Sequence, residues 1–479
     1  MLANIGNIIR KTLGKGSRFR SFWGDVRESI HGSDKDFTEV RMSKAIILLS
    51  IPMVLEMVME SVFAVVDIFF VSKLGADAVA TVGITESVNT IVYAIGMGLG
   101  LATTSMVSRR IGEKNPEAAS KTAFQAILAA SVVSIAIGIP GAVFAKDILG
   151  LMGASDTIVE NLSGYTSIML GGNIVIMLLF IINAVLRSSG DAAVAMRVLW
   201  LGNIINIILD PCLIFGWGPF PEMGITGAAV ATTIGRGIAV AYQFYILFKG
   251  NKRVKLAARH LVVDFKTMGK LISLSLGGIG QNLIATTSWI GLVRIISVFG
   301  SEVVAGYTIA IRIILFVLLP SWGVSNAAST LVGQNLGAGK PERAETAVWF
   351  TGKLNIILLG LIGLILIAFP EFFIKLFIAE PEVIAHGASG LRIISYGFAA
   401  YGFGMVLVNS FNGSGDTITP VKINFVVFWL IEIPLAWFLA IALGLKQTGV
   451  FVAIVIAESL LTIIAWLAFR RGKWKQNVV

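Results

Sequence analysis

The N-terminal half of this chain recurs in its C-terminal half at a fixed offset of 225 residues. Ten positions carry the pattern: Gly75, Val79, Ala80, Gly98, Ala102, Val107, Gly112, Pro116, Glu117 and Ala119 recur as Gly300, Val304, Ala305, Gly323, Ala327, Val332, Gly337, Pro341, Glu342 and Ala344. The offset also holds at a second landmark, where Ser189-Gly190-Asp191 matches Ser414-Gly415-Asp416. A duplicated, mostly apolar half of this size predicts a membrane protein built from two similar helical bundles, an architecture typical of secondary transporters.

The composition leaves room for many membrane-spanning helices, since 56% of the 479 residues are hydrophobic and only 14% are charged. An apolar stretch of about 20 residues can cross a bilayer as a helix. Twelve such stretches are predicted: 45–72, 79–107, 120–145, 163–186, 198–216, 226–248, 271–298, 304–332, 348–370, 388–411, 421–443 and 449–469. We therefore expect an all-α integral membrane protein with twelve transmembrane helices in two homologous six-helix bundles.

The basic stretch 249–270 is the expected junction between the two bundles. The predicted division is a cytoplasmic basic tail, an N-terminal bundle, a cytoplasmic linker, a C-terminal bundle and a second cytoplasmic tail, over residues 1–44, 45–248, 249–270, 271–470 and 471–479. Within each bundle a short connection recurs at 109–119 and 334–344, where Gly is expected to end one helix and Pro to begin the next.

The net charge of +10 follows the membrane topology. If the N-terminus is cytoplasmic, 30 of the 38 Lys and Arg residues fall in the tails and the even-numbered connections, and four fall on the other side. This bias is the positive-inside pattern, and an even helix count then places both termini in the cytoplasm. We expect no nucleic-acid partner.

Reactive side chains are scarce. The only cysteine is Cys212, and the three His residues are scattered, so neither a disulfide within the chain nor a cluster of metal ligands is expected. A nucleophile paired with a base is also lacking among the predicted helices. We expect a protein that is not an enzyme and that carries no cofactor and no metal centre.

Acidic residues inside the predicted spans are the most unusual feature, because a charge at bilayer depth costs about 2.5–3.5 kcal/mol on insertion scales. The first half holds five such acids and the second half two: Glu56, Glu60, Asp67, Glu86 and Asp210, then Glu432 and Glu458. The offset partner of Asp67 is Leu292 and that of Glu56 is Gln281. Acidic chemistry therefore belongs mainly to the first half.

The spacing of these acids places them on shared helix faces. Glu56, Glu60 and Asp67 lie on one face of the first predicted helix, and Glu86 shares a face of the second with Asn89 and Tyr93. On the fifth, Asn203, Asn206 and Asp210 form a stripe. Such stripes must face a bundle interior or a wet cavity. Two carboxylates converging on an Asn-bearing site could share a proton or coordinate Na⁺ through oxygen atoms.

Four of these acids also have a structural interpretation. Asp210 precedes Pro211 and could end a helix near the surface, and Asp67 could lie at a solvated rim. For Glu56 and Glu60, structural hydrogen bonding and the lining of a functional cavity both remain open.

Two further features concern movement of the halves. Pro52 removes the amide that would bond to Leu48, so a bend is expected in the first helix, either static or mobile. Arg312 occupies the offset equivalent of Ser87, beside Glu86, so the halves could pair charge across a cleft.

Six motifs in this chain resemble those of the multidrug and toxic compound extrusion (MATE) transporters. They are IP at 51–52, VDIFFVSKLG at 66–75, VSRRIGEKN at 107–115, LRSSGD at 186–191, NIILDP at 206–211 and MGITGAAVAT at 223–232. The resemblance covers residues 44–470, in order and with compatible spacing. It implies a monomer in the plasma (inner) membrane, surrounded by lipid. It also implies outward antiport of organic cations or other amphipathic toxins against H⁺ or Na⁺, by alternating access around a V-shaped cavity.

The resemblance also implies roles for individual residues. Ion coupling is carried over to four residues: Asp67, Asp210, Asn206 and Asn183. Of these, Asp67, Asn206 and Asp210 could hold Na⁺. Tyr165 and Thr232 match neighbouring positions of the family and are assigned to the substrate cavity. From their own positions in this sequence, and not from the resemblance, we assign to the same cavity Glu56, Glu60, Glu86, Gln281 and Arg312. The bend expected at Pro52 makes that residue the predicted conformational hinge.

Another branch of the family uses carboxylates on its seventh and tenth helices. Here Gln281 and Asn282 stand on the seventh, and 388–411 contains no acid, which favours a coupling site in the first bundle. The alternative function is a flippase for lipid-linked oligosaccharides or lipids from the same superfamily. That function would need a cationic cavity, and Arg294 and Arg312 keep it open.

Overall fold

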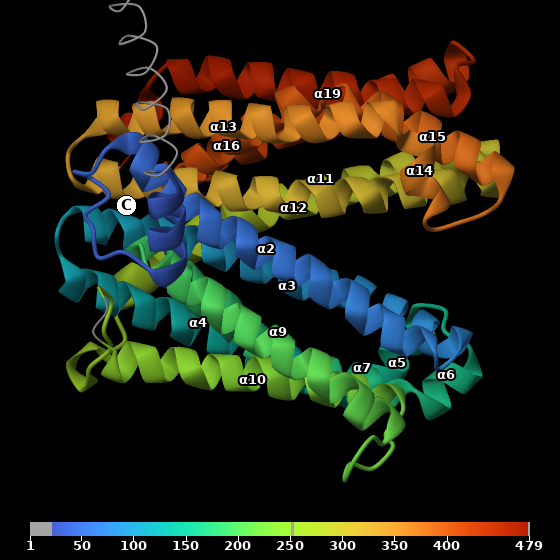
Figure 1. The fold of residues 1–479 in the computed structure, drawn as a ribbon, viewed down its shortest axis with the longest axis horizontal. Helices are drawn as coiled ribbons and strands as arrows, with labels where there is room; N and C mark the ends of the chain where they lie inside the picture. The colour runs from blue at the N-terminus through green and yellow to red at the C-terminus, as the bar shows by residue number, and fades with distance from the viewer. Residues whose placement is uncertain (1–21, 251–252, 478–479) are drawn as a thin grey trace, which may run out of the picture.

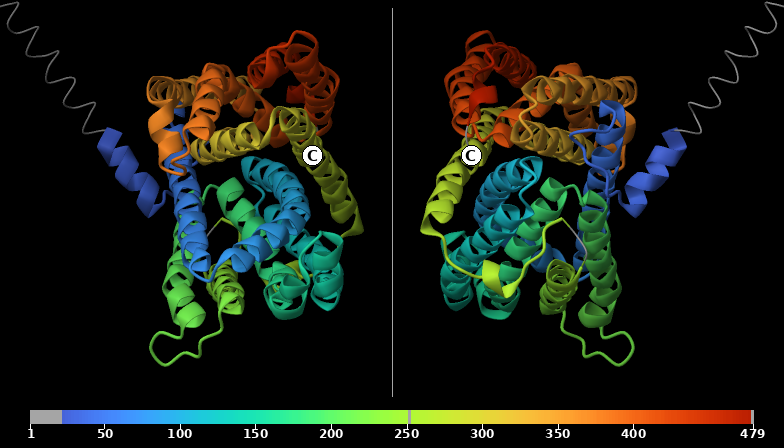
Figure 2. Two further views of the ribbon diagram at one scale, coloured as in Figure 1. Left: turned by 90° about the vertical axis from the view of Figure 1, so that its right-hand side faces the viewer. Right: turned by 90° about the vertical axis from the view of Figure 1, so that its left-hand side faces the viewer.

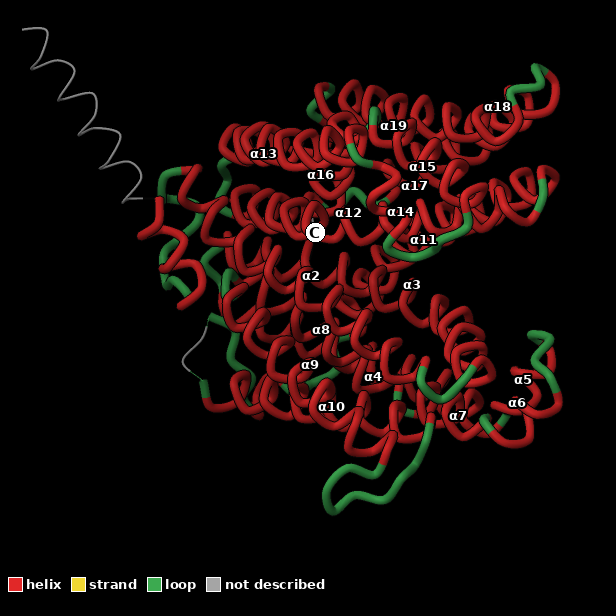
Figure 3. Tube along the Cα trace, turned by 45° about the vertical axis from the view of Figure 1, so that its right-hand side comes forward, coloured by secondary structure: helices red, strands yellow, loops and turns green. Residues whose placement is uncertain are grey.

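Helices make up nearly all of the part of the chain that the computed structural model describes, residues 22–250 and 253–477 (Figure 1). After a helix over 22–31, the first half contains α2 (Met42–Ser72), α3 (Ala76–Gly112), α4 (Pro116–Val143), α5 (Ala145–Leu151), α6 (Asp156–Asn161), α7 (Ser163–Gly171), α8 (Asn173–Ser189), α9 (Ala192–Phe215) and α10 (Ile225–Lys249). The second half contains α11 (Phe265–Ile296), α12 (Ser301–Gly337), α13 (Pro341–Ala368), α14 (Pro370–Lys375), α15 (Pro381–Ser395), α16 (Phe398–Ser414), α17 (Ile418–Asn424), η3 (Phe425–Glu432), α18 (Ile433–Trp437), η4 (Phe438–Ala442) and α19 (Lys446–Arg470). Short 3₁₀ turns lie at η1 (Ala258–His260), η2 (Ser297–Phe299) and η5 (Lys473–Gln476). Figure 3 shows helices and loops, and no strand, over these residues. The predicted all-α fold is confirmed.

The structure also bears out a multi-pass membrane protein. By length and composition, ten helical segments in the described residues can cross a membrane, and the pair α15–α16, bent by 58°, makes an eleventh. The remaining predicted span, 45–72, falls on α2, which carries three acidic residues: Glu56, Glu60 and Asp67. The span predicted at 421–443 is divided into α17, α18 and two π-helical stretches, η3 and η4.

The helices form two groups, one from each half of the sequence. In Figure 1, α2 to α10 lie in the lower group and α11 to α19 in the upper, and the views in Figure 2 show one group stacked on the other. The groups meet where α2 packs on α12 and where α3 packs on α11 and α12. In Figure 1 they lie close together at the left and diverge toward the right. The linker joins α10, which ends at Lys249, to α11, which begins at Phe265, and in Figure 1 these two helix ends lie at the close end. The division of the chain at residues 44, 248, 270 and 470 stays a prediction.

The repeated residues of the sequence mark equivalent turns in the two halves. α3 ends at Gly112 and α4 begins at Pro116, just as α12 ends at Gly337 and α13 begins at Pro341. At the second landmark, Gly190 and Gly415 follow their helices with φ of 98° and 89°. These values lie in the left-handed region that favours glycine at the end of a helix.

Glycines also let the two groups approach closely along a line that we call the seam, formed by α3 against α11 and α12. A methyl group added at Gly112 would collide with the carbonyl of Gln334, and one added at Gly337 would collide with the carbonyl of Arg109. These two contacts are related by the same offset of 225 residues that relates the halves. The duplicated glycines therefore serve the packing of one half on the other, where no side chain fits.

A segment before α2 is held against the same end of the molecule. Arg253, from the linker, donates a 2.6 Å hydrogen bond to the Lys35 carbonyl and lies 5.1 Å from the ring of Phe37, which is buried. Lys340, at the start of α13, donates to the Thr38 carbonyl at 3.1 Å. Residues 33–40 thus contact the linker and the second half. Residues 1–21 of the predicted tail lie outside the described residues.

Candidate functional site

Asp210, on α9, is fully buried within the first half. Helix α9 continues through Pro211 to Phe215, so the interpretation of Asp210 as the end of a helix is wrong. Asn206, one turn earlier, donates from Nδ2 to Asp210 Oδ1 at 3.4 Å and to Thr232 Oγ1 on α10 at 3.0 Å. The structure therefore brings together three of the predicted site residues.

Two oxygen atoms in this group have no hydrogen-bond donor among the described residues: Asp210 Oδ2 and Asn206 Oδ1. A buried acceptor without a donor is costly, and a bound proton or cation would satisfy it. Asp67, on α2, is half-buried, has no hydrogen-bond partner in the described part of the chain, and its charge interacts with that of Asp210. The buried hydroxyl of Tyr165, on α7, lies within electrostatic range of both carboxylates. Asp210 Oδ2 and Asn206 Oδ1 are therefore the atoms of this group that are available to a small cation.

Glu60 belongs to a second polar group, which contains the buried Arg236 of α10. Arg236 Nη2 lies 3.1 Å from Glu60 Oε1, and Asn203 Nδ2 donates to Glu60 Oε2 at 3.0 Å. The guanidinium also lies 5.2 Å from the ring of Phe63. The positive charge of Arg236 also interacts with the negative charges of Glu86 and Asp67, so this arginine partly balances the acidic residues of the first half.

Sequence reasoning missed Arg236 as a member of the site. The available signal was an arginine inside a predicted span of the half that holds most of the acids, with Leu461 at the offset position. Such residues pair with one another or mark a functional pathway.

We expect Arg236→Gln to lower the free energy of unfolding by about 1–3 kcal/mol, because it leaves the Glu60 charge without its partner. The cost stays below that of breaking a wholly enclosed pair, since the Glu60 side chain is 30% exposed. The double variant Glu60→Gln with Arg236→Gln should recover most of the loss. Thermal unfolding in detergent is measured for the unmodified protein, for Arg236→Gln and Glu60→Gln alone, and for the double variant, which together form a double-mutant cycle. Losses that add in the double variant would contradict a direct pair.

Glu56 and Asn183 form a separate group nearer the linker end. Glu56 Oε1 accepts hydrogen bonds from Arg187 at 2.7 Å and from Asn183 at 3.0 Å, and Asn183 in turn accepts one from Gln243 at 2.7 Å. Glu56 is only 1% exposed. The structure thus directs Asn183 toward Glu56 and not toward Asp210. Of the two interpretations left open for Glu56, structural hydrogen bonding is the one these contacts favour.

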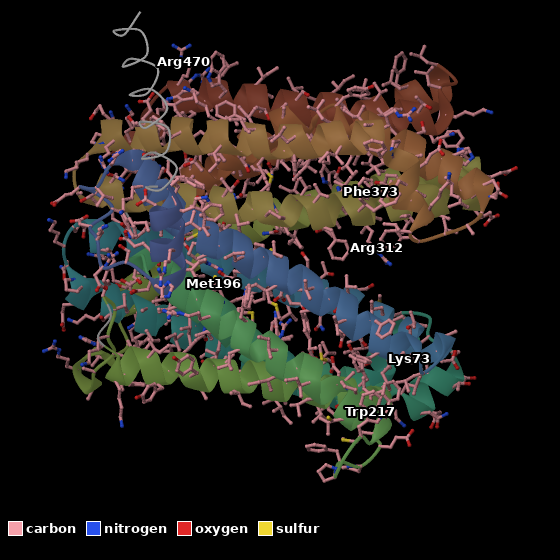
Figure 4. The ribbon with its side chains drawn as sticks, in the orientation of Figure 1. Lys73, Met196, Trp217, Arg312, Phe373 and Arg470 are labelled. Atoms are coloured by element: carbon pink, nitrogen blue, oxygen red, sulfur yellow. The ribbon has the colours of Figure 1, made fainter. Side chains whose placement is uncertain are left out.

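The remaining predicted residues form no hydrogen bond or ion pair with Asp210 or Arg236 among the described residues. Glu86 and Arg312 are both exposed, and no ion pair joins them in the described residues. Arg312 extends from α12 into the space between the two groups of helices (Figure 4). Gln281 is buried and exchanges two hydrogen bonds with Asn412, of 3.0 and 3.1 Å, inside the second half. Pro52 lies within α2, and Gly323 of α12 packs against the backbone of the next residue, Met53.

The second half contains its own smaller acidic group. Glu432, at the end of the π-helical stretch η3, accepts a 2.8 Å hydrogen bond from Ser288 Oγ. Glu458 of α19 has one buried oxygen, Oε2, with no partner among the described residues, and its charge interacts with that of Glu432. No arginine joins these two acids in the described part of the chain, in contrast to the first half.

The two halves also match a known family. The family model MatE matches residues 52–212 and again residues 279–438, one copy in each half. The chain belongs to the MATE transporter family. The transporter is 25% identical over 456 residues to the Probable multidrug resistance protein NorM of Thermotoga maritima, covering 93% of this chain and 95% of the relative. It is 26% identical over 430 residues to a FAD transporter of Shewanella oneidensis, covering 90% and 95%.

Solved structures share the arrangement of both halves. The outward-facing conformation of a multidrug resistance MATE family transporter of the MOP superfamily superposes with a TM-score of 0.86 at 26% identity, covering 92% of this chain and 98% of that one. The MATE transporter described here therefore has the fold that the motifs predicted.

Proposed function

We propose that this MATE transporter is a secondary active multidrug efflux antiporter. It exports organic cations or amphipathic toxins in exchange for H⁺ or Na⁺. The observation that carries the proposal is the buried Asp210, which has an oxygen that lacks a donor and a charge that interacts with that of Asp67. The names of its relatives, a multidrug resistance protein among them, support export of drugs as the task.

The coupling follows from competition for negative charge. Asp67, Asp210 and the exposed Glu86 attract a cationic substrate, whereas a proton or Na⁺ bound between Asp67 and Asp210 cancels part of that charge. Each ligand then weakens the binding of the other, and thermodynamic linkage makes the effect reciprocal. Inward movement of the ion can therefore release the substrate on the outer side.

The orientation follows from the distribution of charge. Thirty of the 38 Lys and Arg residues belong to the tails and the even-numbered connections, which this bias places in the cytoplasm. Lys266 and Lys270, at the start of α11, lie at the close end of the two groups, so we place that end in the cytoplasm. The diverging end then faces outward, so the structure represents an outward-facing state of the alternating-access cycle. The likeness to a solved outward-facing transporter supports this assignment.

The decisive experiment measures efflux of a fluorescent organic cation from proteoliposomes under a proton gradient alone, a Na⁺ gradient alone, or neither. We expect one gradient to accelerate efflux by about fivefold or more. That gradient also names the coupling ion. Efflux that ignores both gradients would contradict the proposed antiport.

One observation favours a second candidate, a flippase for lipid-linked oligosaccharides or lipids. Arg312 is exposed and extends between the halves, and an arginine in that position suits a pyrophosphate group. Under this alternative, neither gradient would drive cation efflux. The protein would instead transfer a lipid-linked pyrophosphate across the proteoliposome membrane, and Arg312→Gln would lower the rate of this transfer.

We also propose that Pro52 is the hinge of α2. Pro52→Ala restores an amide that can bond to the Leu48 carbonyl, and this bond stiffens the helix that carries Glu56, Glu60 and Asp67. A stiffer helix should slow gradient-driven efflux by about tenfold, because the proposed hinge moves these acids during the cycle. Efflux rates in proteoliposomes, compared at equal amounts of folded protein, measure the effect. Unchanged efflux would contradict a mobile hinge and would favour the alternative, a static bend at Pro52.

A further inference from the structure

A cavity, which we call the basic pocket, lies at the close end of the two groups of helices. It has a volume of about 620 Å³ and is enclosed by the end of α3, the first turns of α11, the end of α12 and the segment after α19. In Figure 1 the C-terminus lies at this end, beside the meeting point of the groups. The basic pocket is therefore shared between the two halves, and neither Asp210 nor its hydrogen-bond partners line it.

Positive charge dominates its lining. Five cationic side chains face one carboxylate: Arg109, Arg110, Lys266, Lys270 and Lys475 against Glu113. Arg110 pairs with Glu113 at 2.8 Å, and Lys475 pairs with Glu345 outside the pocket at 2.6 Å. The other three cations have no carboxylate partner in the described part of the chain.

These three cations are held together against their mutual repulsion. The charge of Lys270 is repelled by both arginines and by Lys266. Arg109 is only 8% exposed, and its guanidinium donates to the backbone carbonyl of Asn477, which fixes it in the wall. Its own carbonyl lies in the seam, against Gly337. The repulsion persists because the packing of the helices fixes the positions of these cationic side chains. An anion in the cavity would relieve it.

We propose that the basic pocket binds a phosphate-bearing anion. Arginine and lysine are the side chains that recognise phosphate, and about 300–1,000 Å³ is the usual size of a ligand cavity. The phosphate can come from the headgroup of an anionic phospholipid of the inner leaflet or from a soluble phosphate compound of the cytoplasm.

Binding there would bear on the transport cycle. Arg109 and Arg110 belong to the first half, and the two lysines of α11 and Lys475 belong to the second. A bound anion thus links the halves at their close end and stabilises the state seen here, since a ligand shifts an equilibrium toward the state that binds it better. This consequence rests on the proposed function, whereas binding itself does not.

The test compares two probes in nanodiscs. Binding of pyrophosphate is measured by calorimetry in discs of phosphatidylcholine, and retention of phosphatidylglycerol is measured by native mass spectrometry after reconstitution in mixed discs. The pocket variant is Lys266→Gln with Lys270→Gln. The control, Lys121→Gln with Lys255→Gln, removes two exposed lysines, one at the start of α4 and one in the linker, that do not line the pocket.

We expect the pocket variant to weaken anion binding by about tenfold or more, because each lysine near the membrane surface attracts anionic headgroups. The control should bind like the unmodified protein. Pyrophosphate binding assigns a soluble ligand, and retention of phosphatidylglycerol without pyrophosphate binding assigns a lipid. Lys266→Arg with Lys270→Arg keeps the charge and should bind normally, which separates loss of charge from misfolding. Equal binding by the pocket variant and the control, or no binding of either probe to the unmodified protein, would overturn the proposal. None of these readouts needs transport, so they stand even if antiport fails.

Discussion

Asp210→Asn is expected to abolish ion-driven efflux while the protein stays folded. Asparagine matches the shape of the side chain, but it cannot carry the negative charge that attracts both the ion and a cationic substrate. Because Asp210 is fully buried and one of its oxygens lacks a donor, removing its charge should leave the free energy of unfolding unchanged or slightly higher. The rate of efflux under the active gradient should fall by about 100-fold or more.

The measurement is efflux from proteoliposomes, with thermal unfolding in detergent as the check on folding. Asp77→Asn is the matched control, since Asp77 is an exposed acid in the first turn of α3. Asp67→Asn should show the same loss, and the double variant should be no worse than either single one, because the two charges act as one site. Gradient-driven efflux by Asp210→Asn at the rate of Asp77→Asn would contradict a coupling role.

The general architecture could be predicted because it depends on local chemistry. Apolar length marks the spans, Gly112 and Pro116 mark a turn that recurs at Gly337 and Pro341, and the spacing of acids marks a helix face. Each of these signals is carried by residues close together in the chain. The motifs NIILDP and MGITGAAVAT also identify Asn206, Asp210 and Thr232, although the resemblance assigns Thr232 to the substrate cavity and the other two to ion coupling.

The pairing of side chains could not be predicted in the same way. Spacing places Glu56 and Glu60 on one face, but the rotation of α8 and α10 around α2 decides which partner each one meets. In the structure, Glu56 meets Arg187 and Glu60 meets Arg236. A sequence pattern reports the face of each helix, whereas an ion pair depends on the angle between helices.

The seam offers the second large effect. Gly112→Ala and Gly337→Ala each place a methyl group against a backbone carbonyl of the opposite half, and a carbonyl in a helix cannot turn aside as a side chain can. Overpacking of this kind costs about 1–3 kcal/mol. The cost falls on the state in which the close end is closed, so each variant should shift the equilibrium toward the opposite state by about 5–150-fold.

Spin labels at Lys73→Cys and Lys375→Cys, in a Cys212→Ser background, report the distance between the diverging ends of the two halves. In Gly112→Ala and Gly337→Ala the distance distribution should move toward shorter values, and efflux should slow, because one state of the cycle becomes too rare.

Gly83→Ala is the matched control on α3, since a methyl group there meets no atom within 4 Å. In a helix that change alone is mildly favourable. If both seam variants gave the same label distances and efflux rates as Gly83→Ala, close packing at the seam would not hold the two halves in the observed state. The symmetry of the two contacts sharpens the test: Gly112 meets Gln334 and Gly337 meets Arg109, so the two variants should shift the equilibrium alike. A seam built from one duplicated contact thus predicts equal effects from residues 225 positions apart.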